Sequence, residues 1–421
     1  MKFVHAADLH LDSPMVGLRR YEGAPVEEIR AATRRALENL VELCIAERAE
    51  LLLLAGDLYD GDWRDYSTGL FFAAQMSRLR EASVRVVWIR GNHDAASQIT
   101  RHLRLPEGMH ELSPLEPATC TLEDLGVAVH GQGFAKRAIT ADLAATYPEP
   151  IPGLFNIGLL HTCLTGRVGH DPYAPCTTEA LVNRGYAYWA LGHVHRREIV
   201  CSDPWIVFPG NLQGRHAREV GDKGATLVTV QDGAVSRVDH VALDVVRFCR
   251  SEIDLSDLGS PDDMLEHARR LLERAAAAAE GRTLAARIAL VGSGALQQRL
   301  EADPERWENE VRVLATDLGG YGVWLERLDF VPGPLASDPT TQGAEVLQRL
   351  LGSMHRLRRE PRALEALMSE LGPLRSKLPP EVRAAPDGEG LRLDSPSALG
   401  ALLDDAERLL RSKLVPADER S

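Results

Sequence analysis

Five short clusters of histidine, aspartate and asparagine constrain this chain more than any other feature of its sequence. Each cluster follows an apolar, often β-branched run that stops abruptly, which is typical of the end of a buried strand. Open α/β sheets carry their functional sites at strand ends, so we expect the clusters to meet in one site. In chain order they are Asp8-Leu9-His10, Gly56-Asp57-Leu58-Tyr59-Asp60, Gly91-Asn92-His93-Asp94, His161 and Gly192-His193-Val194-His195.

Each cluster also has an ordinary explanation when it is taken alone. Gly-Asp and Gly-Asn-His-Asp strings are common turns, and a single histidine such as His161 is more often a hydrogen-bonded structural residue. That explanation weakens because all five clusters fall in one predicted domain, each at a strand end and each with side chains that can bind a metal.

The side chains of the clusters offer nitrogen and oxygen ligands and no thiolate, and they are too many for one four-coordinate zinc ion. Mixed imidazole and carboxylate ligation suits Mn²⁺, Fe²⁺ or Zn²⁺ at higher coordination number. A carboxylate between two groups of ligands can bridge two ions, and Asp57 is the natural candidate. Two ions about 3.5–4 Å apart clamp both oxygens of a phosphoryl displacement and lower the pKa of a bound water to about 7.

The first half of the chain alternates predicted strands with predicted helices, which indicates a largely parallel α/β layer. The strands are 2–6, 51–54 and 84–89, and the helices are 27–48 and 69–81. After residue 120 short strands dominate, at 127–130, 155–160, 186–191, 205–208, 225–230 and 235–241.

The pattern changes at residue 246, where a small α+β domain is predicted. Its strands are 246–253, 284–291 and 321–330, and its helices 260–280 and 304–318. The segment Val331-Pro332-Gly333-Pro334, whose prolines and glycine interrupt regular secondary structure, separates this domain from three predicted helices with periodic leucines. These helices are 343–357, 360–371 and 396–412. These helices are either a small bundle or a docking segment for a partner, because short isolated helices need packing. We therefore predict three domains, 1–245, 246–332 and 333–421.

Composition narrows the class of protein. The longest apolar run, Leu51–Ala55, is far too short to span a membrane, and no signal-peptide pattern opens the chain. The six cysteines form no Cys-x-x-Cys pair, which argues against a zinc knuckle or a disulfide framework. We expect a cytoplasmic protein that does not contact membranes.

The charge balance bears on nucleic-acid binding. The net charge is −13, with 31 acidic and 24 basic residues up to residue 245 and 30 and 24 beyond it. An acidic chain is not expected to bind nucleic acid non-specifically over a large surface, because non-specific affinity comes from basic side chains that neutralise phosphates. Any such contact must use local arginines, metals or the surface of a partner.

The clusters, in this order, resemble the calcineurin-like metallophosphoesterase superfamily. The segments 5–14 (HAADLHLDSP) and 209–216 (PGNLQGRH) resemble the YhaO-type bacterial branch of the SbcD-like DNA repair exonucleases. The resemblance is highly specific over residues 1–245, weaker over 246–330 and weakest beyond residue 331. It implies an α/β fold of two packed mixed β-sheets flanked by helices, in four layers. It also implies a small α+β cap that binds DNA, and the helices with periodic leucines add a helical C-terminal tail.

The same resemblance implies a role for each site residue. Asp8, His10 and His195 would hold one metal and Asn92, His161 and His193 the other, with Asp57 bridging them. His93 would be catalytic and face the phosphate, Asp94 would orient it, and a metal-bridging hydroxide would be the nucleophile. For Arg215 and His216, contact with substrate phosphate and a structural ion pair are both open.

Three functions are compatible with the sequence. The first is a Mn²⁺-dependent DNA exonuclease or endonuclease, with two divalent ions, that works with an SbcC-like ABC/SMC-type ATPase and, as the family does, forms a homodimer. The second is a small-molecule phosphodiesterase or phosphatase acting on nucleotides, which the acidic balance favours slightly. The third is a structural or recruiting subunit. The subfamily-like segments lead us to prefer the first.

Overall fold

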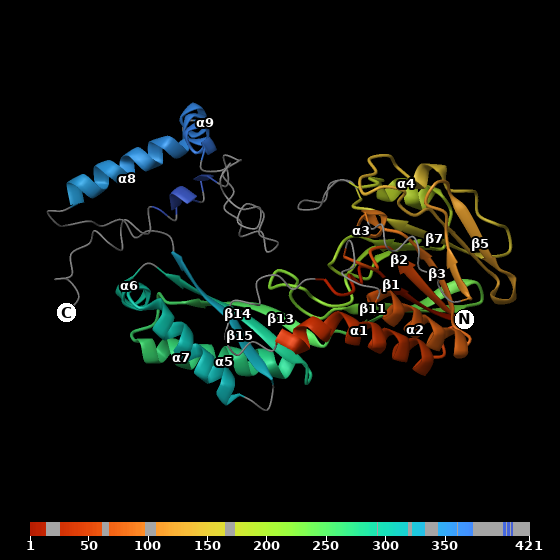
Figure 1. The fold of residues 1–421 in the computed structure, drawn as a ribbon, viewed down its shortest axis with the longest axis horizontal. Coiled ribbons are helices and arrows are strands. Elements are labelled where there is room, and N and C mark those ends of the chain that lie inside the picture. The colour runs from red at the N-terminus through yellow and green to blue at the C-terminus, as the bar shows by residue number, and fades with distance from the viewer. Residues whose placement is uncertain are drawn as a thin grey trace. The chain divides into compact units, whose positions relative to one another are not determined.

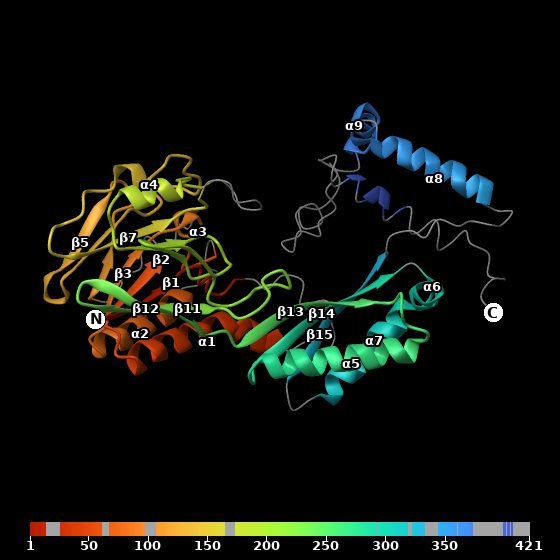
Figure 2. The same ribbon diagram turned by 180° about the vertical axis from the view of Figure 1, so that it is seen from behind.

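The computed structural model describes residues 1–13, 26–60, 67–96, 107–164, 173–292, 294–318, 322–332, 344–359 and 361–373, with a few positions between 399 and 406. The chain divides into two compact units. The first takes in nearly all described residues up to Phe248 together with 282–284, and the second takes in 249–281 and the chain from residue 285. Figures 1 and 2 show the ribbon from opposite sides.

The first unit contains two six-stranded sheets. The first sheet has the order β12-β11-β1-β2-β3-β4, in which β1 to β4 are parallel and β11 is antiparallel to both β1 and β12. Its strands are β1 (Lys2–Ala6), β2 (Leu51–Ala55), β3 (Arg85–Ile89), β4 (Met109–Glu111), β11 (Gly224–Gln231) and β12 (Ala234–Ala242).

The second sheet has the order β5-β6-β7-β8-β10-β9. Strands β6, β7, β8 and β10 are parallel, and β5 and β9 are antiparallel edges. The strands are β5 (Ala118–Leu122), β6 (Val127–Gly131), β7 (Phe155–His161), β8 (Tyr188–Gly192), β9 (Glu198–Ser202) and β10 (Trp205–Phe208). Both sheets are mixed, as the sequence predicted.

Helices complete the layers of the first unit. The long helices α1 (Val26–Ala46) and α2 (Ser67–Glu81) cover the outer face of the first sheet (Figure 1). The outer face of the second sheet packs against α4 (Thr178–Asn183), the 3-10 turn Ala144–Thr146 and Ala95 of α3 (Asn92–Ala96). A further 3-10 turn, Glu123–Leu125, joins β5 to β6. The result is the predicted four-layer arrangement of helices, sheet, sheet and helices.

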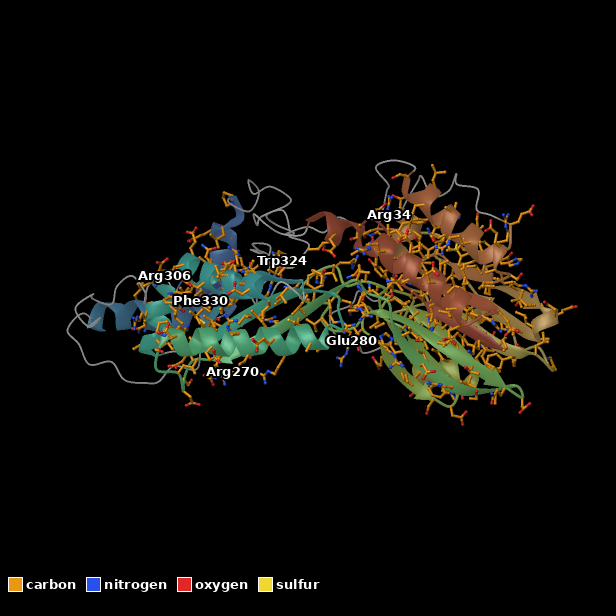
Figure 3. All side chains as sticks on the ribbon, turned by 90° about the horizontal axis from the view of Figure 1, so that it is seen from below. Arg34, Arg270, Glu280, Arg306, Trp324 and Phe330 are labelled. Atoms are coloured by element: carbon orange, nitrogen blue, oxygen red, sulfur yellow. The ribbon has the colours of Figure 1, made fainter. Side chains whose placement is uncertain are left out.

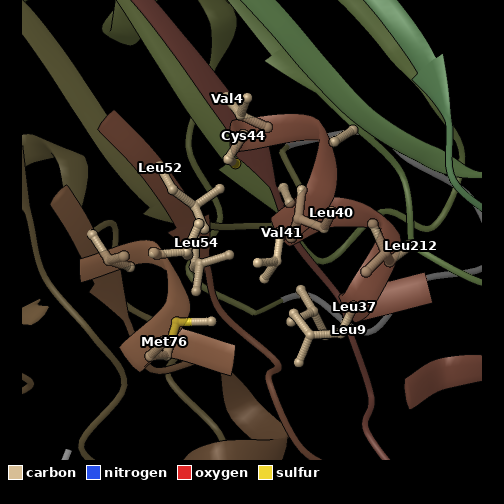
Figure 4. Packing of buried hydrophobic residues seen from close by; sticks show 14 of the residues in the cluster. Val4, Leu9, Leu37, Leu40, Val41, Cys44, Leu52, Leu54, Met76 and Leu212 are labelled. Atoms are coloured by element: carbon tan, nitrogen blue, oxygen red, sulfur yellow. The ribbon is translucent and has the colours of Figure 1, made fainter. Parts of the chain in front are cut away.

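The apolar strands explain why a core forms on each face of the first sheet. Side chains alternate between the faces of a strand, so a strand that is apolar at every position is buried on both faces. On β2, Leu52 and Leu54 join the core beneath α1 and α2, whereas Leu51 and Leu53 join the core between the sheets. Figure 4 shows the first of these cores, in which Leu40 and Val41 of α1 lie among the strand side chains.

The second unit contains most of a three-stranded sheet, together with three helices. The sheet has the order β13-β14-β15, from β13 (Val246–Asp254), β14 (Thr283–Gly292) and β15 (Val323–Pro332). The helices are α5 (Pro261–Ala278), α6 (Ala295–Glu301) and α7 (Pro304–Asp317). Two exposed arginines, Arg270 on α5 and Arg306 on α7, are labelled in Figure 3, and the Arg306 guanidinium lies 4.7 Å from the centre of the Trp307 ring.

Local signals set the ends of these helices. The Ser260 hydroxyl accepts a hydrogen bond from the Asp263 amide, and the Asp303 carboxylate accepts one from the Arg306 amide. Each cap is followed by a proline, which suits the first turn of a helix. Along α5, Met264, Ala268, Leu272 and Ala276 are buried at a spacing of four residues, which places one stripe of the helix in the core.

Two helices follow in the last part of the chain, α8 (Ala344–Arg359) and α9 (Pro361–Glu370). Leu364 of α9 packs with Leu399 in a small apolar cluster. Most of the helix predicted at 396–412 lies outside the described residues. Among the helices that are described, none is both long enough and apolar enough to cross a membrane.

Candidate metal centre

The five clusters lie at the carboxyl ends of five strands, three from one sheet and two from the other. Asp8, Asp57 and Asn92 follow β1, β2 and β3, whereas His161 ends β7 and His193 follows β8. Backbone bonds join the neighbouring loops: the Asp8 amide donates to the Gly56 carbonyl at 3.0 Å, and the His10 amide donates to the Asp57 carbonyl at 3.1 Å. Across the sheets, the His193 amide donates to the Asp8 carboxylate at 3.0 Å.

The first group of candidate ligands is Asp8, His10 and His195, whose ligand atoms lie within 4.8 Å of one another. The two Nε2 atoms of His10 and His195 are 3.2 Å apart, and His195 Nε2 is 3.9 Å from Asp8 Oδ1. Asp8 and His10 are essentially buried. Burial and the nearby Arg215 lower the pKa of His10 to about 3, which keeps its imidazole neutral and able to offer a lone pair.

The second group is Asp57, His161 and His193, which satisfies the same distance limit. Asn92 joins it, because its Oδ1 lies 2.9 Å from His161 Nε2. Asp57 connects the two groups through one atom, since its Oδ2 lies 3.9 Å from His10 Nε2 and 3.5 Å from His161 Nε2. All seven predicted ligands therefore meet at one place, with Asp57 between the groups. That they bind metal remains a prediction.

The protonation of His161 tests whether a cation fits this place. Its Nδ1 lies 2.9 Å from the Ala55 carbonyl, which can only accept, so Nδ1 carries a proton. In the neutral ring Nε2 then presents a lone pair to the oxygens of Asn92 and Asp57, which also accept. A cation resolves this conflict, either as a proton on Nε2 or as a metal ion between the three side chains. Burial alone would lower the pKa of His161, but the Asp57 and Asp8 carboxylates raise it to about 9, which also indicates a centre that attracts positive charge.

Close packing explains the glycines of the clusters. A Cβ atom on Gly91 would lie 2.2 Å from Asp57 Oδ1, and one on Gly56 would lie 2.5 Å from His161 Nδ1. The backbone is also strained, because Asp8, His10 and Asp57 have φ angles of 53°, 43° and 53°, in the left-handed region that most residues avoid. Strain of this kind persists where the surrounding structure holds it, and it gathers at functional sites.

The structure corrects the expected partner of His93. We expected Asp94 to orient it, but the Asp94 carboxylate accepts backbone bonds from Gly91, Tyr59 and Leu58 at 2.9, 3.1 and 3.3 Å and so ties two loops together. Asp60 makes the contact instead, with its Oδ1 2.9 Å from His93 Nδ1. Asp94 is three residues from the glycine amide that it binds, a local bond that turns its side chain toward the backbone.

The charges around His93 follow from that contact. Burial acts to lower the pKa of His93, but the hydrogen bond to Asp60 and the charge of Asp57 raise it. Burial acts to raise the pKa of Asp60, yet hydrogen bonds with His10 and His93 hold it far below its ordinary value. The pKa of Asp94 is raised to about 7 by burial and by Asp57.

Arg215 and His216 both lie beside the centre. Arg215 Nη1 is 3.6 Å from Asp60, and its Nη2 is 3.4 Å from Glu219. His216 Nε2 is 3.7 Å from the same glutamate. The contacts of Arg215 are the structural ion pairs that the sequence left open, whereas burial lowers the pKa of His216 and disfavours a charge on its ring. Contact of either residue with substrate stays a prediction. Glu219 was not anticipated from the sequence: it lies three residues beyond the segment 209–216, and its spacing of four from Arg215 was the one available signal.

Two family models and several known proteins match this chain. The family model described as calcineurin-like phosphoesterase matches residues 1–197, and the one described as metallophosphoesterase YhaO, middle domain, matches residues 248–331. An uncharacterized metallophosphoesterase YhaO from Bacillus subtilis is 32% identical over 343 residues, which is 78% of this chain and 81% of that protein. The chain belongs to the YhaO family of calcineurin-like metallophosphoesterases. This metallophosphoesterase is thus a phosphoester hydrolase of a family that uses divalent metals.

Two further matches are more distant from this metallophosphoesterase. The DNA double-strand break repair protein Mre11 of Methanopyrus kandleri is 28% identical over 302 residues, covering 64% of this chain and 63% of that protein. Among solved structures, a dimetal phosphatase from Danio rerio is 12% identical, with a TM-score of 0.35, covering 55% of this chain and 93% of that one.

Proposed function

We propose that this metallophosphoesterase is a Mn²⁺-dependent nuclease that hydrolyses the phosphodiester bonds of DNA. The observation that carries the proposal is the pair of ligand groups that share Asp57 Oδ2, with His93 beside them. When bound, two divalent ions supply positive charge for a phosphate and an activated water. Asp8, His10 and His195 would hold one ion and Asn92, His161 and His193 the other, with Asp57 common to both.

His93 is the residue of this chain best placed to meet the phosphate. Its side chain is 34% exposed, compared with 22% for His195, and the other candidate ligands are buried. Because Asp60 binds its Nδ1, the other ring nitrogen is the one that can donate to a phosphate oxygen or protonate the leaving 3′ oxygen. Asp60 therefore fixes the orientation of a general acid.

Two observations support DNA as the substrate. One is the similarity to a protein whose name assigns it to the repair of DNA double-strand breaks. The other is the second unit, most of whose described residues match the YhaO middle domain and which we propose to be a DNA-binding cap. We further propose that α8 and α9 dock an SbcC-like ABC/SMC-type ATPase, whose surface would offset the net charge of −13.

The test compares substrates and variants of the full chain. Duplex DNA, single-stranded DNA and bis(p-nitrophenyl) phosphate are each incubated with the protein, with Mn²⁺ or with EDTA. We expect Mn²⁺-dependent cleavage of DNA, which His93→Ala slows by roughly 10²- to 10⁴-fold, the usual contribution of a general acid. Binding of Mn²⁺ should not change in this variant. The matched control is His110→Ala, an exposed histidine of β4 in the same unit, which should cleave like the parent.

A second candidate function is supported by the acidic charge, which suits a small substrate better than a polyanion. In that case bis(p-nitrophenyl) phosphate and nucleotide diesters would be cleaved with Mn²⁺ while both forms of DNA stayed intact. If none of the substrates reacts, a structural or recruiting subunit becomes the better interpretation. If His93→Ala cleaves DNA as fast as the parent, the role given to His93 is wrong.

A further inference from the structure

Glu219 is a buried carboxylate that the proposed chemistry does not use. It lies in the loop between β10 and β11 and is 8% exposed. Its Oε1 is 2.7 Å from His195 Nδ1, and its Oε2 accepts hydrogen bonds from the Arg215 amide at 2.7 Å and from Asn211 Nδ2 at 2.8 Å. Burial acts to raise its pKa, but the hydrogen bond from His195 and the charge of Arg215 hold the pKa well below its ordinary value.

The contact with His195 decides which ring nitrogen carries the proton. A carboxylate can only accept, so a separation of 2.7 Å requires a proton on Nδ1 of His195. Nε2 is then left with its lone pair, and it is this atom that lies 3.2 Å from His10 Nε2 and 3.9 Å from Asp8. Glu219 thus turns His195 into the form in which it can bind a metal.

A competing contact favours the opposite form. Arg215 Nη2 lies 3.2 Å from the same Nδ1 atom of His195, and an arginine can only donate. If Arg215 donated a hydrogen bond to Nδ1, the proton of the neutral ring would lie on Nε2 and would block coordination of a metal. The shorter contact belongs to Glu219, and a charged acceptor at that distance makes a stronger hydrogen bond than a longer contact to a neutral ring.

The same loop also holds the backbone of His195. Lys223 Nζ donates to the His195 carbonyl at 2.9 Å, and the Asn211 amide donates to it at 3.4 Å. Asn211 is in turn bonded to Glu219. The imidazole and the peptide of one candidate ligand are therefore both held by residues 211–223, whereas no comparable contact of Glu219 reaches Asp57, His161 or His193 among its described partners.

We propose that Glu219 is a positioning residue for one of the two metals: it sets the tautomer and orientation of His195 against the pull of Arg215. The proposal rests on the metal-binding part of the proposed function, and not on DNA as the substrate. Carboxylates that hold a ligand histidine in this way commonly contribute 10- to 100-fold to metal affinity. The effect should be confined to the ion held by Asp8, His10 and His195.

The test is an equilibrium titration of the full chain with Mn²⁺, in which the free ion is measured by its electron paramagnetic resonance signal. The variants are Glu219→Gln and Glu219→Ala. We expect two classes of site in the parent, and in Glu219→Ala a weakening of one class by roughly 10- to 100-fold while the other class is unchanged. Glu219→Gln retains an acceptor oxygen but not the charge, so its Mn²⁺ affinity at the weakened class of site should lie between those of the parent and Glu219→Ala.

A double variant separates positioning from simple loss of a contact. In Glu219→Ala, Arg215 is free to donate to His195 Nδ1, so adding Arg215→Met should recover part of the lost affinity. Glu326→Gln is the matched control, because Glu326 is also a largely buried glutamate paired with an arginine, at 2.8 Å from Arg287, but in the second unit. It should leave both classes of site unchanged.

Each outcome is decisive. The proposal is overturned if Glu219→Ala leaves both classes unchanged or weakens both equally, since the second result would mean a general structural role. Unfolding temperatures measured in EDTA identify a variant that is simply unstable. If Glu219→Ala is unstable, the Mn²⁺ affinities of Glu219→Gln and of Glu219→Gln combined with Arg215→Met are compared instead. A failure to cleave DNA does not affect this test, whereas a parent that binds no Mn²⁺ would refute the metal site itself.

Discussion

Histidine side chains in this protein are distinguished by what each ring nitrogen contacts. His161 and His195 each place Nδ1 against an acceptor, the Ala55 carbonyl and the Glu219 carboxylate, and direct Nε2 into the centre. His93 also binds its acceptor, Asp60, through Nδ1, but its ring is partly exposed. A histidine with one nitrogen anchored has a defined tautomer, and that is what a ligand or an acid needs.

His5 gives a prediction about pH, because it is buried beside the centre without belonging to it. Its ring lies 3.1 Å from both the Tyr188 hydroxyl and the Leu191 carbonyl, and burial, partly offset by the Leu191 bond, lowers its pKa from 6.5 to about 3. The unfolded chain takes up a proton below pH 6.5 and the folded chain does not. The contribution of His5 to the free energy of unfolding is therefore fully present above pH 6.5. It is lost as the pH drops toward 3, by at most about 1.4 kcal/mol per pH unit.

The measurement is the free energy of unfolding in EDTA between pH 7 and pH 4.5. We expect His5→Gln to lose stability less steeply than the parent as the pH falls. Tyr188→Phe should keep the steep dependence, because it leaves the histidine buried. Parallel curves for the parent and His5→Gln would show that His5 does not govern this dependence.

At the residue scale, the sequence was sufficient to predict the seven residues that meet, because each one lies at the end of a recognisable strand or within four residues of it. It was not sufficient for the contacts between side chains. Asp60 and Asp94 are both close in sequence to a candidate ligand, and only the turn geometry decides that Asp60 faces His93. Glu219 reaches His195 across a loop of irregular conformation, which no periodicity describes.

At the scale of the element, the loops after β2 and β3 are packed against each other with no spare room. The Cβ position of Gly91 falls 2.2 Å from Asp57 Oδ1 and 2.7 Å from the Asp57 amide. The amide of His93, two residues on, donates to the same Asp57 oxygen at 2.9 Å. A side chain at residue 91 must therefore displace the carboxylate on which both ligand groups depend.

We predict that Gly91→Ala lowers both stability and metal affinity. Overpacking of this kind typically costs about 1–3 kcal/mol, and the displaced Asp57 should weaken both classes of Mn²⁺ site. The control is Gly294→Ala, since Gly294 has an ordinary φ of −92° and open space around its Cβ position. Denaturant unfolding and a Mn²⁺ titration measure the two effects. Unchanged Mn²⁺ binding in Gly91→Ala would contradict this account of Asp57.

The strands were predicted more fully than the short elements around them. A strand such as β2 or β7 is apolar at nearly every position because it is buried on both faces, and that pattern is visible in the sequence. The edge strands β5 and β9 are partly exposed and carry no such signal, and helices of five to seven residues such as α3, α4 and α6 are too short for a helical period. Which strand lies beside which was also not readable, because pairing between β1 and β11 joins residues far apart in the chain.

At the scale of the whole molecule, each candidate metal draws ligands from both sheets. Asp8 and His10 follow a strand of the first sheet, and His195 follows a strand of the second. The other group is divided in the same way, with Asp57 and Asn92 against His161 and His193. Bound ions would therefore stabilise the first unit against unfolding, by about 2.7 kcal/mol at a free concentration one hundred times the dissociation constant.

We predict that Mn²⁺ raises the unfolding temperature of the first unit and that EDTA reverses this. The second unit, which contributes none of the candidate ligands, should unfold at the same temperature in both conditions. Differential scanning calorimetry of the full chain measures the two transitions. In Asp57→Asn, which alters the shared ligand, the shift with Mn²⁺ should be smaller. A shift of the second transition alone would place the metals elsewhere.

The ends of β1 and β8 are already joined without any ion, through the bond from the His193 amide to the Asp8 carboxylate. That bond holds an acidic side chain at the seam between the sheets before a cation arrives. One link between the two strand ends is therefore present in the metal-free protein. Bound metal ions would add further links between the same two strand ends, so removing them should loosen the contact between the two sheets at the candidate site.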